Sequence, residues 1–273
     1  MERLACAEFL SWAMPRLGLR WAGFRRMRGQ VCKRVRQRLR ALRIEGLAAY
    51  VAYLGGHPAE WRVLDGLCRV TVSRFYRDRE VFDALSRRHL PALLASCAGS
   101  PLRMWSVGCA SGEEPYSLAM IAGIRLRRRF PSQEVSIVGT DVDAHLLERA
   151  QRACYRESSL RELPRDLLEQ GFRRIGAERC LRAEYRHGVE FLLQDVRRDA
   201  PPGRFGLVLC RNLAFTYYAE DRQRLVLPRL TERLEPGGLL VIGRGERLPP
   251  GDHGLEPLSG ETGIFRSVRS IPR

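Results

Sequence analysis

Residues 102–124 constrain the fold more than any other stretch of the chain. Leu102–Val107 is a short apolar run, which is typical of a buried strand. Small residues dominate positions 108–112, where they suit a tight turn. Residues 113–115 are Glu, Glu and Pro, which match the positive first turn of a helix, and residues 116–124 are apolar at helical spacing. The pattern therefore predicts a strand, a tight turn and a helix.

The chemistry of this turn is that of a ligand site. In an open α/β sheet, such a turn lies at the carboxyl edge of the strands, where ligands bind. Gly108, Ala110 and Gly112 leave room for a ligand to approach the backbone closely. The turn lacks the lysine of a triphosphate-binding loop, and Glu113 and Glu114 repel phosphate. We therefore expect a ligand without phosphate.

Four later strands are expected to reach the same sheet, and a terminal strand returns within Gly260–Val268. Their ranges are Val135–Thr140, Val189–Gln194, Phe205–Cys210 and Leu239–Ile242. Between the last two, residues 218–234 are expected to form a helix that stops at Glu235-Pro-Gly-Gly238. The residues directly after three of these strands are the further site candidates, namely Asp141, Asp195 with Val196, and Arg211 with Asn212.

An acid at the end of the second strand is where doubly wound folds bind a ribose. Asp141 holds that place, about thirty residues after the glycine turn. The alternative is that Asp141 only caps the next helix, although Asp143 suits that role better. With the acidic turn, this edge suits a cofactor that has a ribose, an adenine and a positive charge. S-adenosylmethionine meets that description, because its sulfonium is cationic and it carries no phosphate.

The domain organisation expected from the sequence is an all-α N-terminal domain over residues 1–90 and an α/β domain over 91–273. Within the first, Arg25–Arg43 predicts a strongly basic amphipathic helix, whose apolar stripe repeats at three- and four-residue steps. Residues 79–98 predict a further helix. Residues 155–190 interrupt the α/β alternation and predict a helical turn followed by a small β hairpin.

The net charge and the cysteine spacing limit which partners and ligands the chain is expected to have. The chain has 273 residues and a net charge of +16, but Lys33 is the only lysine among its 47 basic residues. Two interpretations stay open, solvated arginines or attraction to an acidic partner. No apolar run reaches the roughly 18 residues of a membrane span. The eight cysteines show neither CxxC nor zinc-ligand spacing, so we expect no metal and reduced, cytoplasmic thiols.

The sequence resembles the CheR-type methyltransferases, which use S-adenosylmethionine to methylate glutamate side chains of bacterial chemoreceptors. The resemblance runs from about Val31 to Leu248. It rests on the Trp-Ser-Val-Gly-Cys-Ala-Ser-Gly-Glu-Glu-Pro-Tyr-Ser segment at 105–117, Arg-Phe-Tyr-Arg-Asp at 74–78, Thr-Asp-Val-Asp at 140–143, Cys-Arg-Asn at 210–212 and Pro-Gly-Gly-Leu-Leu-Val-Ile-Gly at 236–243.

This resemblance implies a fold, a reaction and a partner. The fold is a class I, Rossmann-like methyltransferase domain with an inserted β subdomain, preceded by an all-α domain. The reaction is carboxylate O-methylation, with S-adenosylhomocysteine as product, in a chemotaxis pathway of the cytoplasm. The partner is an acidic protein, such as a chemoreceptor's cytoplasmic helix, met by the basic helix. We expect a monomer, no membrane insertion and no nucleic-acid partner, since the Asn/Asp-Pro-Pro-aromatic segment of base-amino methyltransferases is missing.

The resemblance also implies residue roles. The expected cofactor-binding set is Thr71, Ser73, Arg77, Gly108, Ala110, Glu113, Glu114, Asp141, Asp195, Val196, Arg211 and Asn212. Asp141 is its ribose-binding acid, Asp195 and Val196 replace the family's Asn-Leu beside the adenine, and Thr71 replaces an asparagine. Arg77 and Tyr217 are the expected catalytic residues. An arginine, Arg77 or Arg211, would orient the acceptor carboxylate with paired donors.

Two segments depart from the family pattern. After Asn212 the chain reads Leu213-Ala-Phe-Thr-Tyr-Tyr-Ala-Glu220, so the family's tyrosine place falls to Tyr217 if one residue is inserted and to Thr216 otherwise. The run Gly243-Arg-Gly-Glu-Arg replaces the usual Gly-x-Ser-Glu. Because both flank the expected acceptor mouth, two alternatives stay open: the same cofactor with another protein side chain or a metabolite as acceptor, and a binding module without catalysis.

Overall fold

The computed structural model describes residues 2–97 and 99–268, and within them the chain divides into two compact units. The first unit runs to Thr71 and also takes Thr216–Gln223. The second takes Val72–Phe215 and resumes at Arg224. No helix in these described ranges is long and apolar enough to cross a membrane.

This division differs from the boundary near residue 90 that the sequence suggests. The helical segments α6 (Arg79–Ala84), η1 (Leu85–His89) and α7 (Leu90–Ser96) belong to the second unit. Phe82 and Leu94 join its hydrophobic core, so burial of these apolar side chains ties the segment to the sheet. The expected end of this helix near Ala98 lies outside the described residues.

Five helices make up most of the first unit. They are α1 (Glu2–Arg16), α2 (Trp21–Phe24), α3 (Arg28–Leu42), α4 (Gly46–Gly56) and α5 (Pro58–Leu67). The basic helix thus begins at Arg28, later than expected, and its apolar stripe at Val31, Val35 and Leu39 is buried as predicted. Arg34 and Arg38 are used within this unit, because Arg34 donates to backbone carbonyls and Arg38 pairs with Glu60 at 2.7 Å. The exposed bases within and next to α3 are Arg25, Arg26, Arg28, Lys33, Arg36, Arg40 and Arg43.

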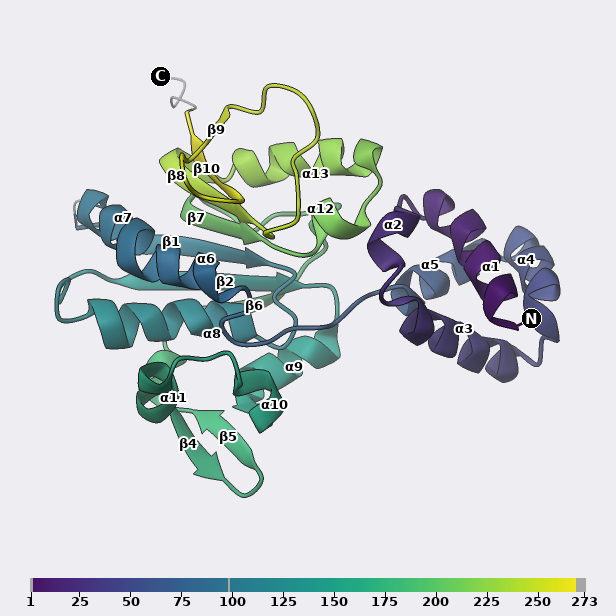
Figure 1. The fold of residues 1–273 in the computed structure, drawn as a ribbon, viewed down its shortest axis with the longest axis horizontal. Helices are drawn as coiled ribbons and strands as arrows, with labels where there is room; N and C mark the ends of the chain where they lie inside the picture. Colours follow the sequence, from purple (N-terminus) through teal and green to yellow (C-terminus); the bar gives the residue numbers. More distant parts are fainter. Residues whose placement is uncertain (1, 98, 269–273) are drawn as a thin grey trace. The chain divides into compact units, whose positions relative to one another are not determined.

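The second unit is built on a seven-stranded sheet, in the order β6-β2-β1-β7-β8-β10-β9 (Figure 1). Its strands are β1 (Leu102–Val107), β2 (Val135–Asp141), β6 (Val189–Leu193), β7 (Phe205–Cys210), β8 (Leu234–Ile242), β9 (Leu255–Pro257) and β10 (Ile264–Ser267). The first five in spatial order pair in parallel, and β10 pairs antiparallel with both β8 and β9. The expected α/β class is confirmed.

Helices connect these strands. They are α8 (Glu113–Met120), which continues as the π-helical turn η2 (Ile121–Leu126), α9 (Ala144–Arg152), α10 (Glu157–Leu160), α11 (Arg165–Gly171), η3 (Ala183–Tyr185), α12 (Ala214–Tyr217) and α13 (Glu220–Thr231). One expectation is wrong here: Glu235-Pro-Gly-Gly238 does not separate a helix from a strand. The helix has already ended at Thr231, and these residues lie inside β8, where its register with β7 shifts.

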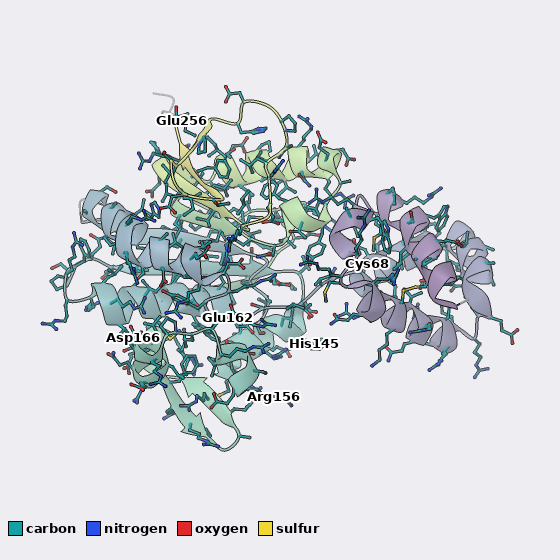
Figure 2. The ribbon with its side chains drawn as sticks, viewed as in Figure 1. Cys68, His145, Arg156, Glu162, Asp166 and Glu256 are labelled. Carbon is teal, nitrogen blue, oxygen red and sulfur yellow. A yellow bond between two sulfur atoms is a disulfide. The ribbon has the colours of Figure 1, made fainter. Side chains whose placement is uncertain are left out.

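The predicted insertion forms a three-stranded antiparallel sheet, in the order β3-β5-β4. Its strands are β3 (Cys154–Tyr155), β4 (Phe172–Ile175) and β5 (Glu178–Leu181). Two ion pairs attach the neighbouring helical segment to the rest of the unit, Arg74 with Glu162 at 2.9 Å and Arg125 with Asp166 at 2.7 Å; Figure 2 labels both acids. The insertion is therefore fixed to the sheet domain by charge as well as by its apolar contacts.

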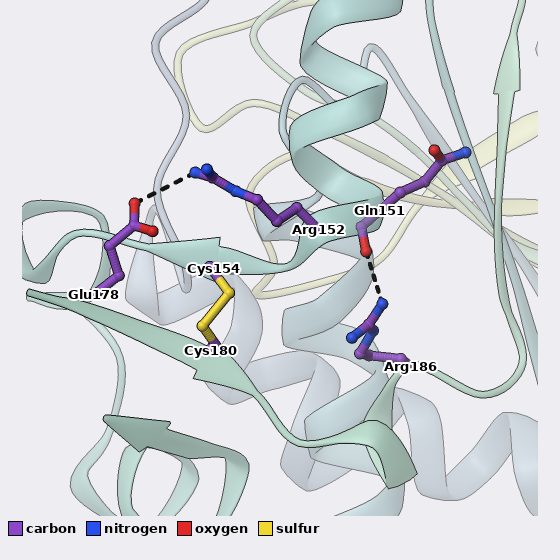
Figure 3. The surroundings of a disulfide bond; sticks show 6 residues. All are labelled: Gln151, Arg152, Cys154, Glu178, Cys180 and Arg186. Carbon is purple, nitrogen blue, oxygen red and sulfur yellow. Dashed lines mark hydrogen bonds and ion pairs between the residues drawn. A yellow bond between two sulfur atoms is a disulfide. The ribbon is translucent and has the colours of Figure 1, made fainter. Parts of the chain in front are cut away.

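The expectation that the cysteines are reduced thiols is wrong for four of the eight. Disulfides join Cys6 to Cys32 and Cys154 to Cys180, with Cα–Cα distances of 6.2 and 4.0 Å. Figure 3 shows the second bridge, which links directly opposed residues of β3 and β5. Short-range spacing rules cannot find such pairs, because folding brings together cysteines 26 residues apart.

We expect alkylation of aerobically purified, denatured protein to label four cysteines without reductant, namely Cys68, Cys97, Cys109 and Cys210, and all eight after reduction. The Cys154→Ser variant should lose about 3.5 kcal/mol of unfolding free energy on the chain-entropy model for a loop of this length. Mass spectrometry and urea titration check both results. Labelling of all eight cysteines without reductant would contradict this assignment.

Candidate active site

The carboxyl ends of the parallel strands gather the predicted site at one edge of the sheet. The turn after β1 is bonded directly to the end of β2, because the N–H groups of Gly108 and Cys109 both donate to the Thr140 carbonyl, at 2.8 and 3.0 Å. The indole N–H of Trp105, buried in β1, donates to the Thr140 hydroxyl at 3.0 Å. These bonds fix the glycine turn against the strand that ends in Asp141.

The turn has the left-handed backbone that its small residues permit. Gly108, Ala110 and Gly112 have φ values of 69°, 49° and 86°. A Cβ atom on Gly108 would lie 2.6 Å from Cδ2 of Leu213, so a larger residue would force the chain apart there. The backbone of the turn at Gly108 therefore packs closely against the side chain of Leu213.

Asp141 is held at the centre of this edge. One carboxylate oxygen accepts from the N–H of Ala110 at 2.9 Å and the other from the N–H of Asp143 at 3.0 Å. Burial raises the pKa of Asp141, although these backbone donors act in the opposite direction. Asp143 performs the helix-capping role, because it accepts from the N–H groups of His145 and Leu146. The carboxylate of Asp141 is thus positioned beside the turn and is not the cap of α9.

The two glutamates of the turn have different surroundings. Glu114 accepts from the Ser106 hydroxyl and from Arg211, both at 2.8 Å. Glu113 is 2% exposed, and one of its oxygens accepts from Ser111 at 2.8 Å. Burial raises the pKa of Glu113, although its own backbone, the Ser111 hydroxyl and the nearby Ser73 favour the charged form. Ser73 therefore lies at the site, against Glu113.

Arg211 joins three segments of the second unit. Its side chain is 2% exposed and pairs with Glu114 and Asp78, both at 2.8 Å. It also donates to the Arg77 carbonyl at 2.7 Å, and its guanidinium lies 5.1 Å from the ring centroid of Phe82. With two carboxylates bound, Arg211 is better suited to hold Glu114 in place than to capture an acceptor carboxylate.

Asp195 and Val196 follow β6, at the other end of the same row of parallel strands. The Asp195 carboxylate is paired with Arg197 at 2.8 Å, and Val196 is buried. Burial alone would raise the pKa of Asp195, but the hydrogen bonds and charge of Arg197 outweigh it and lower the pKa. Asp195 is therefore a carboxylate at neutral pH and accepts hydrogen bonds only, which suits contact with an amino group such as that of adenine.

The remaining candidate residues are divided between the two units of the chain. Arg77 donates to the Val72 carbonyl at 2.9 Å, and Asn212 has a φ of 55° and donates its N–H to Glu246 at 3.0 Å. Thr71 and Tyr217 belong to the first unit, where the Tyr217 ring centroid lies 4.8 Å from that of Phe24. Their roles at the site stay predictions from the sequence, and the choice between Tyr217 and Thr216 stays open.

Unsatisfied polar atoms mark this edge as a place for a polar ligand. Among the described residues, three buried side-chain polar atoms have no hydrogen-bond partner: Oε2 of Glu113, Oε1 of Gln194 and Nε of Arg211. Gln194 and Arg211 directly follow the parallel strands β6 and β7, and Glu113 is the first residue of α8, after the glycine turn. Leaving such atoms unpaired is costly, so a ligand that pairs with some of them would be favoured. The two free acceptor atoms, Oε2 of Glu113 and Oε1 of Gln194, could accept hydrogen bonds from the ammonium, amino and hydroxyl groups of S-adenosylmethionine.

Sequence reasoning did not single out several residues that shape this edge. Ser106 and Asp78 bind Glu114 and Arg211, Gln194 presents its free oxygen, and Glu246 accepts from two backbone N–H groups of the β7 and β8 ends. The sequence offers one signal for Gln194 and Asp78, which adjoin predicted site residues. Ser106 and Glu246 lie in segments compared with the family pattern, but their partners are known only from the folded chain.

A mostly parallel sheet, an acidic glycine turn after its first strand and an acid at the end of the second strand are the arrangement expected of a class I S-adenosylmethionine-dependent methyltransferase. The model of the CheR methyltransferase S-adenosylmethionine-binding domain matches residues 71–264. The chain therefore belongs to the CheR methyltransferase family, and S-adenosylmethionine is its cofactor.

Three relatives illustrate the match. A chemotaxis protein methyltransferase of Listeria monocytogenes is 34% identical over 71% of this chain and 72% of its own length. An uncharacterized 104.1 kDa protein of Rhodobacter capsulatus is 30% identical over 88% of this chain, which spans only 25% of that protein. A probable biofilm formation methyltransferase of Pseudomonas aeruginosa, WspC, is 29% identical over 88% of this chain and 57% of its own length.

Proposed function

We propose that this enzyme transfers the methyl group of S-adenosylmethionine to the side-chain carboxylate of a glutamate in a chemoreceptor's cytoplasmic region. The observation that carries the proposal is the 34% identity to a chemotaxis protein methyltransferase across most of both chains. A glutamate acceptor makes modest demands on the site, because its carboxylate, with a reference pKa of about 4.3, is already deprotonated at neutral pH and needs no general base.

The cofactor supplies an electrophilic methyl carbon and a thioether leaving group. The residues of the chain bind the cofactor and the acceptor, orient them toward each other and exclude water. Asp141 would hold the ribose hydroxyls, Asp195 and Val196 the adenine, and Glu114 the ammonium of the methionine end. Arg211 keeps Glu114 in position through the 2.8 Å pair, while Arg77 and Tyr217 are the proposed groups that meet the acceptor. In-line approach and removal of water from the acceptor carboxylate would supply most of the rate enhancement.

The basic helix α3 supports an acidic protein partner. Its exposed face carries Arg28, Lys33, Arg36 and Arg40, and the residues just before it add Arg25 and Arg26. Clustered unpaired bases of this kind attract acidic segments over distances up to the Debye length, about 8 Å at physiological salt. We propose that the enzyme works as a monomer that uses this face to meet its acceptor.

The test is transfer of labelled methyl groups to receptor fragments. We expect wild-type protein with labelled S-adenosylmethionine to label cytoplasmic receptor fragments from the same genome, and mild base to release the label as methanol, since a glutamate methyl ester is base-labile. Fragments whose glutamates are replaced by glutamine should stay unlabelled. Base-stable labelling, or labelling only of other cell components, would instead favour the second candidate: the same cofactor with another acceptor, which the altered segment 213–220 motivates.

A further inference from the structure

An exposed ion pair connects two loops at the edge of the sheet domain that carries the site. Arg244 follows the end of β8, and its guanidinium lies 3.1 Å from the carboxylate of Glu80, at the start of α6. Both side chains are largely exposed, at 66% and 76%. Arg244 also lies in the run of residues 243–247, which departs from the family pattern.

Strand order indicates which end of the cofactor faces this pair. The proposed adenine contact follows β6, the ribose contact follows β2, and the methionine-end contact, Glu114, lies between β1 and β7 through its bond to Arg211. The cofactor would therefore run along the edge from β6 toward β7, with the reactive methyl group at the β7 end. The next strand in that direction is β8, and Arg244 directly follows its last buried residues.

Two consecutive residues of β7's end hold both loops in place. Arg211 binds the side chain of Asp78 and the carbonyl of Arg77, which fixes the segment that leads to Glu80. Asn212 donates its N–H to Glu246 at 3.0 Å, and the same Glu246 oxygen accepts from Gly243 at 2.5 Å. The backbone on either side of Arg244 is thus anchored, while its side chain stays exposed.

Arg244 differs from Arg77 and Arg211 in the kind of partner that its side chain has. Arg211 is buried against two acids, and Arg77 donates to the Val72 carbonyl. The partner of Arg244, by contrast, is a solvent-exposed glutamate, and an exposed pair contributes little free energy and exchanges readily. The group that occupies Arg244 is chemically the same as the proposed acceptor, a glutamate side-chain carboxylate.

We propose that Arg244 is an acceptor-binding, specificity-determining residue, and that Glu80 is an internal competitor that holds the place of the acceptor carboxylate until it arrives. This inference rests on the proposed function, since it assumes a carboxylate acceptor. An incoming glutamate displaces Glu80 from Arg244, so the acceptor is selected by charge at the β8 loop. The pair therefore lowers affinity for weakly bound carboxylates and favours a partner that makes further contacts.

The test uses glutarate as probe, because it carries the glutamate side-chain carboxylate and needs no acceptor protein. Calorimetry at low salt, on protein saturated with S-adenosylhomocysteine, would compare wild type with Glu80→Gln, Arg244→Gln and Arg247→Gln. Arg247→Gln is the matched control, since it removes an exposed arginine of the same loop. We expect glutarate to bind about two- to fivefold more tightly to Glu80→Gln and at least about fivefold more weakly to Arg244→Gln. Arg247→Gln should stay within about twofold of wild type.

Cofactor affinity should be unchanged in all three variants, which separates acceptor binding from damage to the cofactor site. With receptor fragments, Arg244→Gln should raise KM more than it lowers kcat, and Glu80→Gln should lower KM. Equal glutarate binding by wild type and Arg244→Gln, or an equal loss in Arg247→Gln, would overturn the proposal. Failure of the proposed function is a different result: wild type would label no receptor fragment, whatever the glutarate affinities are.

Discussion

Replacing Asp141 by alanine should abolish measurable binding of S-adenosylmethionine. The carboxylate is the proposed acceptor for the two ribose hydroxyls, and it also fixes the turn through the N–H of Ala110 at 2.9 Å. Hydrogen bonds to charged groups contribute about 1.5–3 kcal/mol each, so loss of two of them weakens binding by at least about a hundredfold. Isothermal calorimetry against the cofactor measures this directly.

Asp143→Ala is the matched control, because it removes a neighbouring carboxylate that caps α9. We expect it to cost about 1 kcal/mol of unfolding free energy while the cofactor affinity changes less than about threefold. Wild-type affinity in Asp141→Ala would show that Asp141 is not the ribose acid. Equal losses of affinity in both variants would show that the loop, and not the one carboxylate, controls binding.

Replacing Arg211 by methionine should destabilise the sheet domain severely. The substitution keeps much of the side-chain volume but leaves Asp78 and Glu114 without the cation that lies 2.8 Å from each. Removing one partner from a buried ionic group costs about 3–5 kcal/mol, because the remaining charges are left uncompensated. That is a large share of the total stability of a typical domain, about 5–15 kcal/mol. Urea denaturation followed by circular dichroism measures the loss.

The Arg152→Met variant provides the comparison for an exposed pair. Arg152 lies 3.3 Å from Glu178 (Figure 3), with the two side chains 58% and 34% exposed, so its removal should cost less than about 1 kcal/mol. Arg211→Lys keeps the charge but loses the forked guanidinium that reaches two acids. Its loss of unfolding free energy should lie between those of Arg211→Met and Arg152→Met. If Arg211→Met were no less stable than Arg152→Met, Arg211 would not have the structural role that its contacts indicate.

The chain's local patterns were sufficient to predict strands β1, β2, β6 and β7, the glycine turn and the class of cofactor, but not the start of β8 or the strand β9. Asp141 illustrates why: its place depends only on a short apolar run and on the rule that parallel strands end at one edge. The apolar repeat of Val31, Val35 and Leu39 predicted a buried helix face for the same kind of reason.

Features that depend on contacts between residues far apart in the chain could not be predicted from the sequence. Arg211 looked like a ligand contact because its neighbours in the chain belong to the site, yet its partners Asp78 and Glu114 are 133 and 97 residues away. The disulfide between Cys154 and Cys180 likewise depends on the register of β3 with β5. Ion pairs and disulfides of this kind depend on which distant residues the fold brings together. Hydrophobic periodicity, in contrast, can be read from neighbouring residues in the sequence.

The inserted sheet has one further consequence, for the engineering of this family. Tyr155 of β3 is 2% exposed, and its hydroxyl donates to the Ser111 carbonyl of the glycine turn at 2.6 Å. The insertion therefore packs directly against the glycine turn, and it is not an interchangeable module. A chimaera that exchanges this insertion for a relative's must retain a tyrosine at position 155, or the graft will alter cofactor affinity along with whatever recognition it was meant to change.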